Sequence, residues 1–274
     1  MSKRGIGKVK TGCRSLFRAG EMLQESMQRP TPAHRLAARD VPPGFPVMRQ
    51  RWSGLLFLHW PVDAALIQER LPAGLHVDTF NGQAWLGVVP FFMERIRPTG
   101  LPPVPWLSWF MELNVRTYVH DDAGNPGVWF FSLDCNQPIA VEIARKAFHL
   151  PYQHACMQSH RLLDRIHYTS QRKTAASLEA SYIYQLPRHV EPAGEGTLEW
   201  FLVERYLLFS SNPAGDIFCG RVHHEPYQIA EAECESWSTE PLRENDFPIP
   251  EGPPPSMLVA APVDVRIFPL KRLA

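Results

Sequence analysis

The 274-residue sequence lacks a hydrophobic run long enough for a membrane-spanning helix, which needs about 18 apolar residues or more. Its best apolar stretch, Ala84 to Met93, is interrupted by Pro90. We therefore expect no membrane span. The N-terminus also lacks the apolar stretch and small-residue cleavage site of a secretory signal peptide, although it is basic.

Cysteine pairs are missing as well. The five cysteines, at positions 13, 135, 156, 219 and 234, are odd in number, and no two have C-x-x-C spacing. This pattern argues against a disulfide framework and against a structural zinc site. We expect reduced thiols and a cytoplasmic location.

Several catalytic and cofactor motifs are also absent. The chain has no G-x-S-x-G, no G-x-x-x-x-G-K-[ST], no G-x-G-x-x-G and no H-E-x-x-H. Its eleven histidines do not have ligand spacing, since His223 and His224 are adjacent and would point to opposite faces of a strand. We expect no metal and no cofactor.

The net charge of zero hides an uneven distribution of charge. Residues 1–51 carry eleven of the 28 Lys and Arg residues but only three of the 28 acidic residues. The rest of the chain is therefore mildly acidic, which is unsuited to binding nucleic-acid phosphates. Any contact with a polyanion is expected from the basic head alone, and only as a weak one.

Residues 1–47 also differ from the rest in pattern. They contain no strand-like run, a weakly amphipathic segment at 15–28, and proline-broken stretches at 29–32 and 41–46. We interpret them as a mobile N-terminal extension, with a tether to a polyanion or membrane surface as the alternative. Residues 48–274 show no internal boundary and are predicted to form a single domain.

The domain reads as mostly antiparallel β-structure of the α+β class. With 27 prolines, long helices are disfavoured. Strand-like runs include 52–60, 84–93, 112–119 and 128–133, and the last two are joined by the turn-rich loop 121–127. The clearest helix is Pro138 to Phe148, which begins at a proline.

The stretch 112–119 carries the most informative polar pattern. Side chains alternate along a strand, so Glu112, Asn114, Arg116 and Tyr118 share one face. On a central strand such a row needs partners, because unpaired buried charge is costly. The row therefore indicates either the wall of a polar pocket or a solvent-facing sheet with a cross-strand ion pair.

Four further residues are candidates, each with a structural alternative. Arg145 and Tyr152 lie on either side of the end of the predicted helix, and Tyr152 would point into a cavity. The structural alternative is that Arg145 is a basic residue near the negative end of the helix dipole. Glu204 lies in an apolar run beside Arg205, and a structural ion pair is the alternative there. His224 is a pocket candidate on a later strand.

Together these segments resemble the YqjF-like group of bacterial proteins in the acetoacetate-decarboxylase-like superfamily. The resemblance covers roughly 48–240 and rests on residues 52–60, 80–91, 112–119, 130–134, 144–145, 150–152, 204–206 and 223–226. It implies an antiparallel β-cone or barrel with a central polar cavity and a few helices. It also matches Glu112 to the cavity glutamate and Arg145 to the helix arginine.

The sequence differs from the acetoacetate decarboxylases at the position of their nucleophilic lysine. Acetoacetate decarboxylases form a Schiff base through a lysine that follows a proline, whereas Tyr152 follows Pro151 here. We therefore expect no Schiff-base decarboxylase. The leading hypothesis is a protein with a pocket for an oxo-acid-like small molecule, in which Asn114, Arg116, Arg145, Glu204 and His224 bind the ligand. The alternative is a cofactor-independent lyase or isomerase using Glu112, Arg116, Arg145 and Tyr152. A homo-oligomer is compatible with either.

Overall fold

The computed structural model describes residues 28–174 and 176–273. Apart from its last residue, the segment 15–28 lies outside the described residues, as does most of the basic head. No helix in the described ranges is long and apolar enough to cross a membrane. The helices are α2 (Pro32–Arg39), α3 (Ala64–Gln68), α4 (Pro138–Phe148), α5 (Leu198–Val203) and α6 (Glu240–Arg243).

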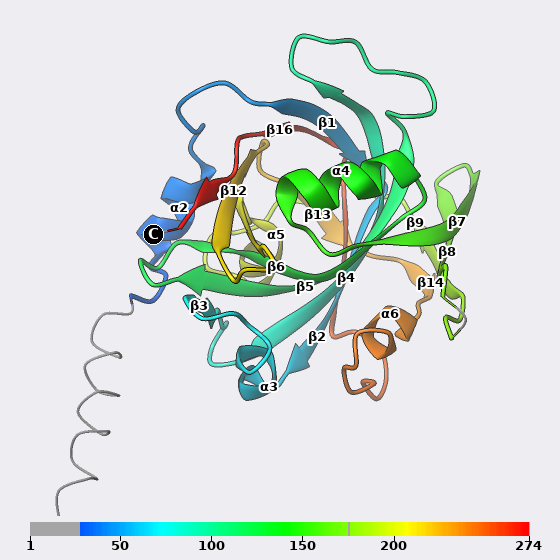
Figure 1. The fold of residues 1–274 in the computed structure, drawn as a ribbon. Coiled ribbons are helices and arrows are strands. Elements are labelled where there is room, and N and C mark those ends of the chain that lie inside the picture. Colours follow the sequence, from blue (N-terminus) through cyan, green and yellow to red (C-terminus); the bar gives the residue numbers. More distant parts are fainter. Residues whose placement is uncertain (1–27, 175, 274) are drawn as a thin grey trace, which may run out of the picture.

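Strands make up most of the regular secondary structure of the described chain (Figure 1). They are β1 (Met48–Ser53), β2 (Leu55–Val62), β3 (Leu75–Val77), β4 (Ala84–Pro98), β5 (Phe110–Asp121), β6 (Pro126–Cys135), β7 (Tyr152–Leu162), β8 (Arg165–Arg172), β9 (Ala180–Gln185), β10 (Glu191–Pro192), β11 (Leu207–Ser211), β12 (Ile217–His223), β13 (Gln228–Glu231), β14 (Cys234–Ser236), β15 (Ser256–Ala260), β16 (Val263–Ile267) and β17 (Lys271–Arg272).

The central strands close into an uneven ring. Going around it, β4 pairs with β5, β5 with β6, β6 with β11, β11 with β12, β12 with β16, β16 with β1, and β1 again with β4. The β6–β11 pairing is parallel and the other six are antiparallel. This mostly antiparallel arrangement confirms the predicted fold class.

Two local predictions are confirmed and one is wrong. The hairpin of β5 and β6 and the helix over Pro138–Phe148 form as expected. The run 52–60 was predicted as one strand but is divided between β1 and β2 at Gly54, which has a φ of +57°. A Cβ at this position would lie 2.7 Å from the ring of Phe92, so this close approach requires glycine.

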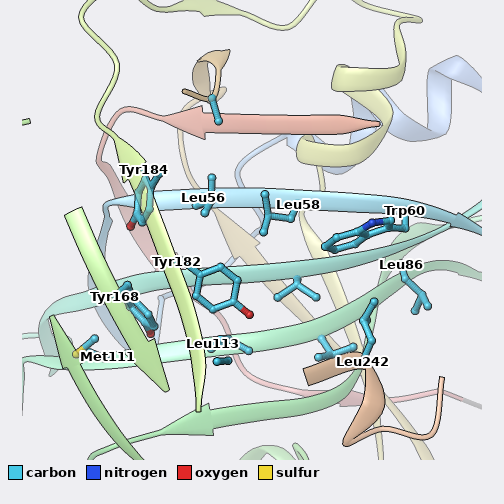
Figure 2. Packing of buried hydrophobic residues seen from close by; sticks show 14 of the residues in the cluster. Leu56, Leu58, Trp60, Leu86, Met111, Leu113, Tyr168, Tyr182, Tyr184 and Leu242 are labelled. Carbon is cyan, nitrogen blue, oxygen red and sulfur yellow. The ribbon is translucent and has the colours of Figure 1, made fainter. Parts of the chain in front are cut away.

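The outer face of the ring carries a separate hydrophobic layer. Leu113 of β5, with Leu56 and Leu58 of β2, packs beneath tyrosines of β8 and β9, of which Figure 2 labels Tyr168, Tyr182 and Tyr184. The Tyr168 hydroxyl donates a hydrogen bond of 2.9 Å to the backbone carbonyl of Glu112. The outer layer therefore holds β5 in place while the opposite face of the strand remains free to line the interior.

Residues 28–47, which belong to the predicted extension, are packed against the domain. Helix α2 begins at Thr31, whose side chain accepts a hydrogen bond from the backbone of His34. From α2, Arg35 binds Asp78 through two hydrogen bonds of 2.7 and 2.8 Å, and Arg39 lies 3.5 Å from Glu204. The folded unit thus extends to the N-terminal side of Met48.

We expect Arg35→Ala to lower the free energy of unfolding by about 1–3 kcal/mol, because it removes a nearly buried, bidentate pairing to a buried carboxylate. Urea unfolding of the two proteins measures the difference. Leu36→Ala on the same helix is the control and should cost less than about 1 kcal/mol, since this side chain is partly exposed. An equal loss in both variants would contradict the role given to Arg35.

Candidate functional site

The interior of the strand ring contains a cavity of about 360 Å³. Every strand of the ring contributes to its wall, and α4 contributes Ala140, Ile143, Ala144 and Phe148. One row of the wall follows the pairing register directly and runs from β4 to β7: Val89, Asn114, Leu133, Tyr152. The wall is mainly apolar, with a few polar side chains in fixed positions, as is usual for small-molecule sites.

The predicted polar face of β5 lies on this wall. Glu112, Asn114 and Arg116 all line the cavity, whereas the intervening Leu113 and Val115 pack into the outer layer. Tyr118, on the same face, is buried in the hydrophobic cluster that surrounds the cavity. Of the two alternatives for this row, the structure shows the pocket wall and not a sheet facing solvent.

Glu112 and Tyr152 form the first polar group of the cavity. The Tyr152 hydroxyl donates a hydrogen bond of 2.6 Å to Oε2 of Glu112. Burial raises the pKa of Glu112 to about 7, although hydrogen bonds from Tyr152 and Asn114 act in the opposite direction. Burial also raises the pKa of Tyr152 well above its usual value, and the Glu112 charge adds to this. Near neutral pH Glu112 can therefore accept or release a proton, with Tyr152 as a fixed donor.

Arg116 forms the second polar group, and no neighbour in the described part of the chain neutralises its charge. Its Nη2 donates to the backbone carbonyl of Leu202 at 3.1 Å and, less closely, to the Tyr118 hydroxyl at 3.4 Å. Its Nε is buried without an acceptor. Among the described residues, no carboxylate oxygen lies within the 4.0 Å of an ion pair with it. A buried cation in this state is a strong attractor for an anionic ligand.

The surroundings of Arg116 keep other groups neutral. His59 Nε2 lies 2.7 Å from the Tyr118 hydroxyl, and burial, followed by the Arg116 charge, holds the pKa of His59 well below its usual value. Gly87 lies between His59 and Arg116 in the sheet register. A Cβ there would lie 3.1 Å from the His59 ring and 3.4 Å from Arg116 Cγ. Glycine thus makes room for both side chains.

Asn114 lies between the two polar groups. It donates a hydrogen bond to Glu112, which is one of the influences that lower the pKa of that carboxyl. Its Oδ1 is buried without a donor. An unpaired buried acceptor on a cavity wall is costly unless a ligand or water supplies a donor.

The structure does not bring Arg145 into the cavity. Its Nε donates to the backbone carbonyl of Tyr152 at 2.8 Å, and its Nη1 lies 3.7 Å from Glu142 on the outer side of α4. The side chain is 39% exposed. Arg145 therefore positions the segment that carries Tyr152, and the geometry gives it no direct contact with a ligand in the cavity.

Glu204 and His224 lie behind the cavity wall. Glu204 is occupied by the Tyr206 hydroxyl, by the backbone N–H of Tyr227 at 2.9 Å and by Arg39. His224 is buried between Tyr206 and Tyr227, with ring centroids 4.7 and 4.4 Å away, and burial lowers its pKa to about 4. Both residues support Tyr227, which lines the cavity. The structural alternative given for Glu204 agrees with this arrangement.

The described lysines lie outside the cavity. Lys146 is 80% exposed and lies 3.6 Å from Glu142, and Lys173 and Lys271 are also exposed. Within the described residues, no group of histidine, cysteine or acidic side chains could hold a metal ion. The cavity walls thus offer carboxyl, phenol, amide and guanidinium groups for chemistry.

Sequence reasoning missed several residues of this site. Tyr227 and Phe57 line the cavity, and His59 lies within hydrogen-bond distance of the Tyr118 hydroxyl beside Arg116. The strand alternation of 52–60 would have placed Phe57 and His59 on one face, but nothing in that segment shows which face is internal. Tyr227 follows the end of β12 and is directed inward by its backbone contact to Glu204.

Several solved structures superpose on this chain over most of its length. An acetoacetate decarboxylase-like enzyme from Sphingomonas wittichii RW1 superposes with a TM-score of 0.56 at 14% identity, covering 84% of this chain and 94% of that one. An acetoacetate decarboxylase from Legionella pneumophila gives 0.55 at 14% identity, covering 85% and 88%. The enduracididine biosynthesis enzyme MppR, complexed with pyruvate, gives 0.57 at 11% identity, covering 86% and 92%. The chain has the acetoacetate-decarboxylase-like fold.

The sequence comparisons identify the family within this fold. The chain belongs to the DUF2071 family of uncharacterized conserved proteins, whose model matches residues 49–264. It is 37% identical over 233 residues to the uncharacterized protein YqjF of Bacillus subtilis (strain 168). The aligned region covers 85% of this chain and 95% of that protein. Both findings confirm the resemblance drawn from the sequence.

Proposed function

We propose that this protein binds a small oxo-acid-like carboxylate in the cavity of its strand ring. The observation that carries the proposal is the buried, uncompensated Arg116 on the cavity wall. A ligand carboxylate would neutralise this charge through charge-assisted hydrogen bonds. The pyruvate complex of MppR, which has the same fold, supports a ligand of this chemical type.

Calorimetric titration tests the proposal. The protein is titrated with the sodium salts of short and longer oxo-acids and, as controls, with the methyl ester of each acid. We expect saturable binding of at least one carboxylate with one site per chain, and no binding of the corresponding ester. If no carboxylate of any length binds, or if the esters bind equally well, the proposed function is wrong.

A second candidate function is proton transfer on such a ligand. It is favoured by the pKa of Glu112 near 7 and by the adjacent Tyr152 hydroxyl. In this reaction the Glu112 carboxylate removes a proton from the carbon next to the ligand carbonyl. The C–H electron pair becomes the enolate, and its oxygen accepts a hydrogen bond from a cavity donor such as Tyr152. Return of the proton at the same or another carbon gives exchange or isomerisation.

Deuterium exchange into the bound oxo-acid, followed by NMR in D₂O, tests the second candidate. We expect exchange to be faster with the protein than without it, and to drop at least about tenfold in Glu112→Gln. Calorimetry on the same variant should still show binding. Equal exchange rates in the parent protein and in Glu112→Gln would contradict the second candidate function and leave the binding function alone.

A further inference from the structure

Two of the polar groups of the cavity, Arg116 and the Glu112–Tyr152 pair, form separate poles, and Gln50 and Arg97 also line the cavity. Arg116 contacts α5 through the Leu202 carbonyl, whereas Tyr152 is tied to α4 through Arg145. Along β5 the Cα atoms of Glu112 and Arg116 are four residues apart, or roughly 14 Å at about 3.4 Å per residue. A compound of the size of pyruvate or acetoacetate is too short to fill the space between the two poles.

Apart from Asn114, the wall between the poles is apolar and largely aromatic. Phe57, Val89, Phe91, Phe130 and Leu133 line it, and they offer no hydrogen bonds to a polar ligand. The cavity volume of about 360 Å³ has room for roughly a dozen non-hydrogen atoms at about 30 Å³ each. Burying carbon against such a wall is favourable, by about fourfold in affinity for each methylene.

We propose that the ligand is a carboxylate with an apolar body that separates the acid group from a carbonyl or hydroxyl group. The carboxylate binds Arg116, the apolar body packs against the aromatic wall, and the carbonyl or hydroxyl group reaches Tyr152, Glu112 and Asn114. This inference rests on the proposed function, because it concerns the same cavity, and it adds the length and polarity of the ligand.

A set of four probes separates the parts of this inference. The first is (4-acetylphenyl)acetate, in which an apolar ring separates the acid from a ketone. The others are (4-ethylphenyl)acetate, which lacks the ketone, 2-(4-acetylphenyl)acetamide, which lacks the charge, and acetoacetate, which lacks the apolar body. By calorimetry we expect the first probe to bind at least a hundredfold more tightly than acetoacetate and than the amide.

The outcomes also distinguish this inference from the proposed function. If acetoacetate binds as tightly as (4-acetylphenyl)acetate, the apolar-body inference is wrong while the proposed function stands. If no carboxylate binds, both are wrong. Tyr152→Phe should weaken binding of (4-acetylphenyl)acetate several-fold and leave the binding of (4-ethylphenyl)acetate unchanged. An equal effect on both would contradict the assignment of the carbonyl pole.

Two variants of α4 place the ligand inside the cavity. Ala144 lines the cavity, whereas Ala147 is exposed on the same helix. We expect Ala144→Phe to reduce the affinity for (4-acetylphenyl)acetate at least tenfold, because the introduced ring fills the space, and Ala147→Phe to have no effect. Circular dichroism should show both variants folded. Unchanged affinity in a folded Ala144→Phe would overturn the placement.

Discussion

Arg116→Met should weaken the binding of carboxylate ligands at least about a hundredfold. The guanidinium lies on the cavity wall with one clear hydrogen bond, to the Leu202 carbonyl, and no carboxylate among the described residues within ion-pair distance. Two charge-assisted hydrogen bonds to a ligand carboxylate are worth about 3 kcal/mol together, and 1.4 kcal/mol corresponds to a tenfold change in affinity. Calorimetric titration of the two proteins with the same carboxylate measures the loss.

The same variant should remain folded, which separates a binding role from a structural one. Replacing a buried charge that has no ion-pair partner by an apolar side chain of similar size is close to neutral. We therefore expect its free energy of unfolding to stay within about 1 kcal/mol of the parent protein.

Arg205→Met is the matched control for Arg116→Met. Arg205 is equally buried but lies 2.9 Å from Asp78, and its loss leaves that carboxylate with Arg35 alone. This control should cost at least about 2 kcal/mol. A large stability loss in Arg116→Met, or retained binding, would contradict the role given to Arg116.

Glu112→Gln should remove about 3 kcal/mol of pH dependence from the stability of the protein. The pKa of Glu112 is raised from 4.5 to about 7 in the folded state by burial. Below pH 4.5 the carboxyl is protonated in both states, so its contribution is fully present. Between pH 4.5 and 7 the unfolded chain ionises first, and the free energy of unfolding falls by about 1.4 kcal/mol per pH unit. Above pH 7 the loss is complete.

Glutamine stays neutral at every pH. The difference in the free energy of unfolding between Glu112→Gln and the parent protein therefore isolates the contribution of the Glu112 carboxyl. We expect Glu112→Gln to gain about 3 kcal/mol relative to the parent between pH 4.5 and 8, measured by urea unfolding at each pH. Other buried groups, such as Asp134, whose pKa is raised to about 6 mainly by burial, contribute to both curves and cancel. Glu179→Gln, at an exposed position, is the control and should give a nearly constant difference. A flat difference for Glu112→Gln would mean that this carboxyl is not buried as described.

Strand alternation was sufficient to predict which residues of β5 share the polar face of the site. It left open whether this face lines a pocket or meets solvent, and the structure shows that Glu112, Asn114 and Arg116 line the cavity. The position of Tyr152 at the start of a strand after Pro151 likewise indicated that its side chain could enter the cavity. These inferences depend on local geometry, which a single sequence contains.

The roles of Arg145 and Glu204 depended on contacts that a local pattern does not contain. Arg145 lies just before His149, which ends α4 in the left-handed conformation, and the returning chain places the Tyr152 carbonyl within reach of Arg145 Nε. Glu204 is satisfied partly by Arg39, far away in the sequence. The interpretation of residues 1–47 as a separate extension did not include this contact.

The closure of the ring was also beyond the reach of the sequence alone. Parallel pairings of β6 with β11 and with β7 join segments that no short turn connects. Their formation depends on the whole set of packed layers and not on the propensity of one segment. The sequence therefore predicted the site residues of one strand, while the cavity itself required the three-dimensional structure.

The most direct test of the central claim is a crystal structure of the protein soaked with (4-acetylphenyl)acetate. The carboxylate is predicted to lie within hydrogen-bond distance of the Arg116 guanidinium, with the phenyl ring inside the strand ring and the ketone directed toward Tyr152. Density for the ligand only outside the cavity, or a carboxylate directed away from Arg116, would contradict the claim that this buried arginine is the anion-binding group.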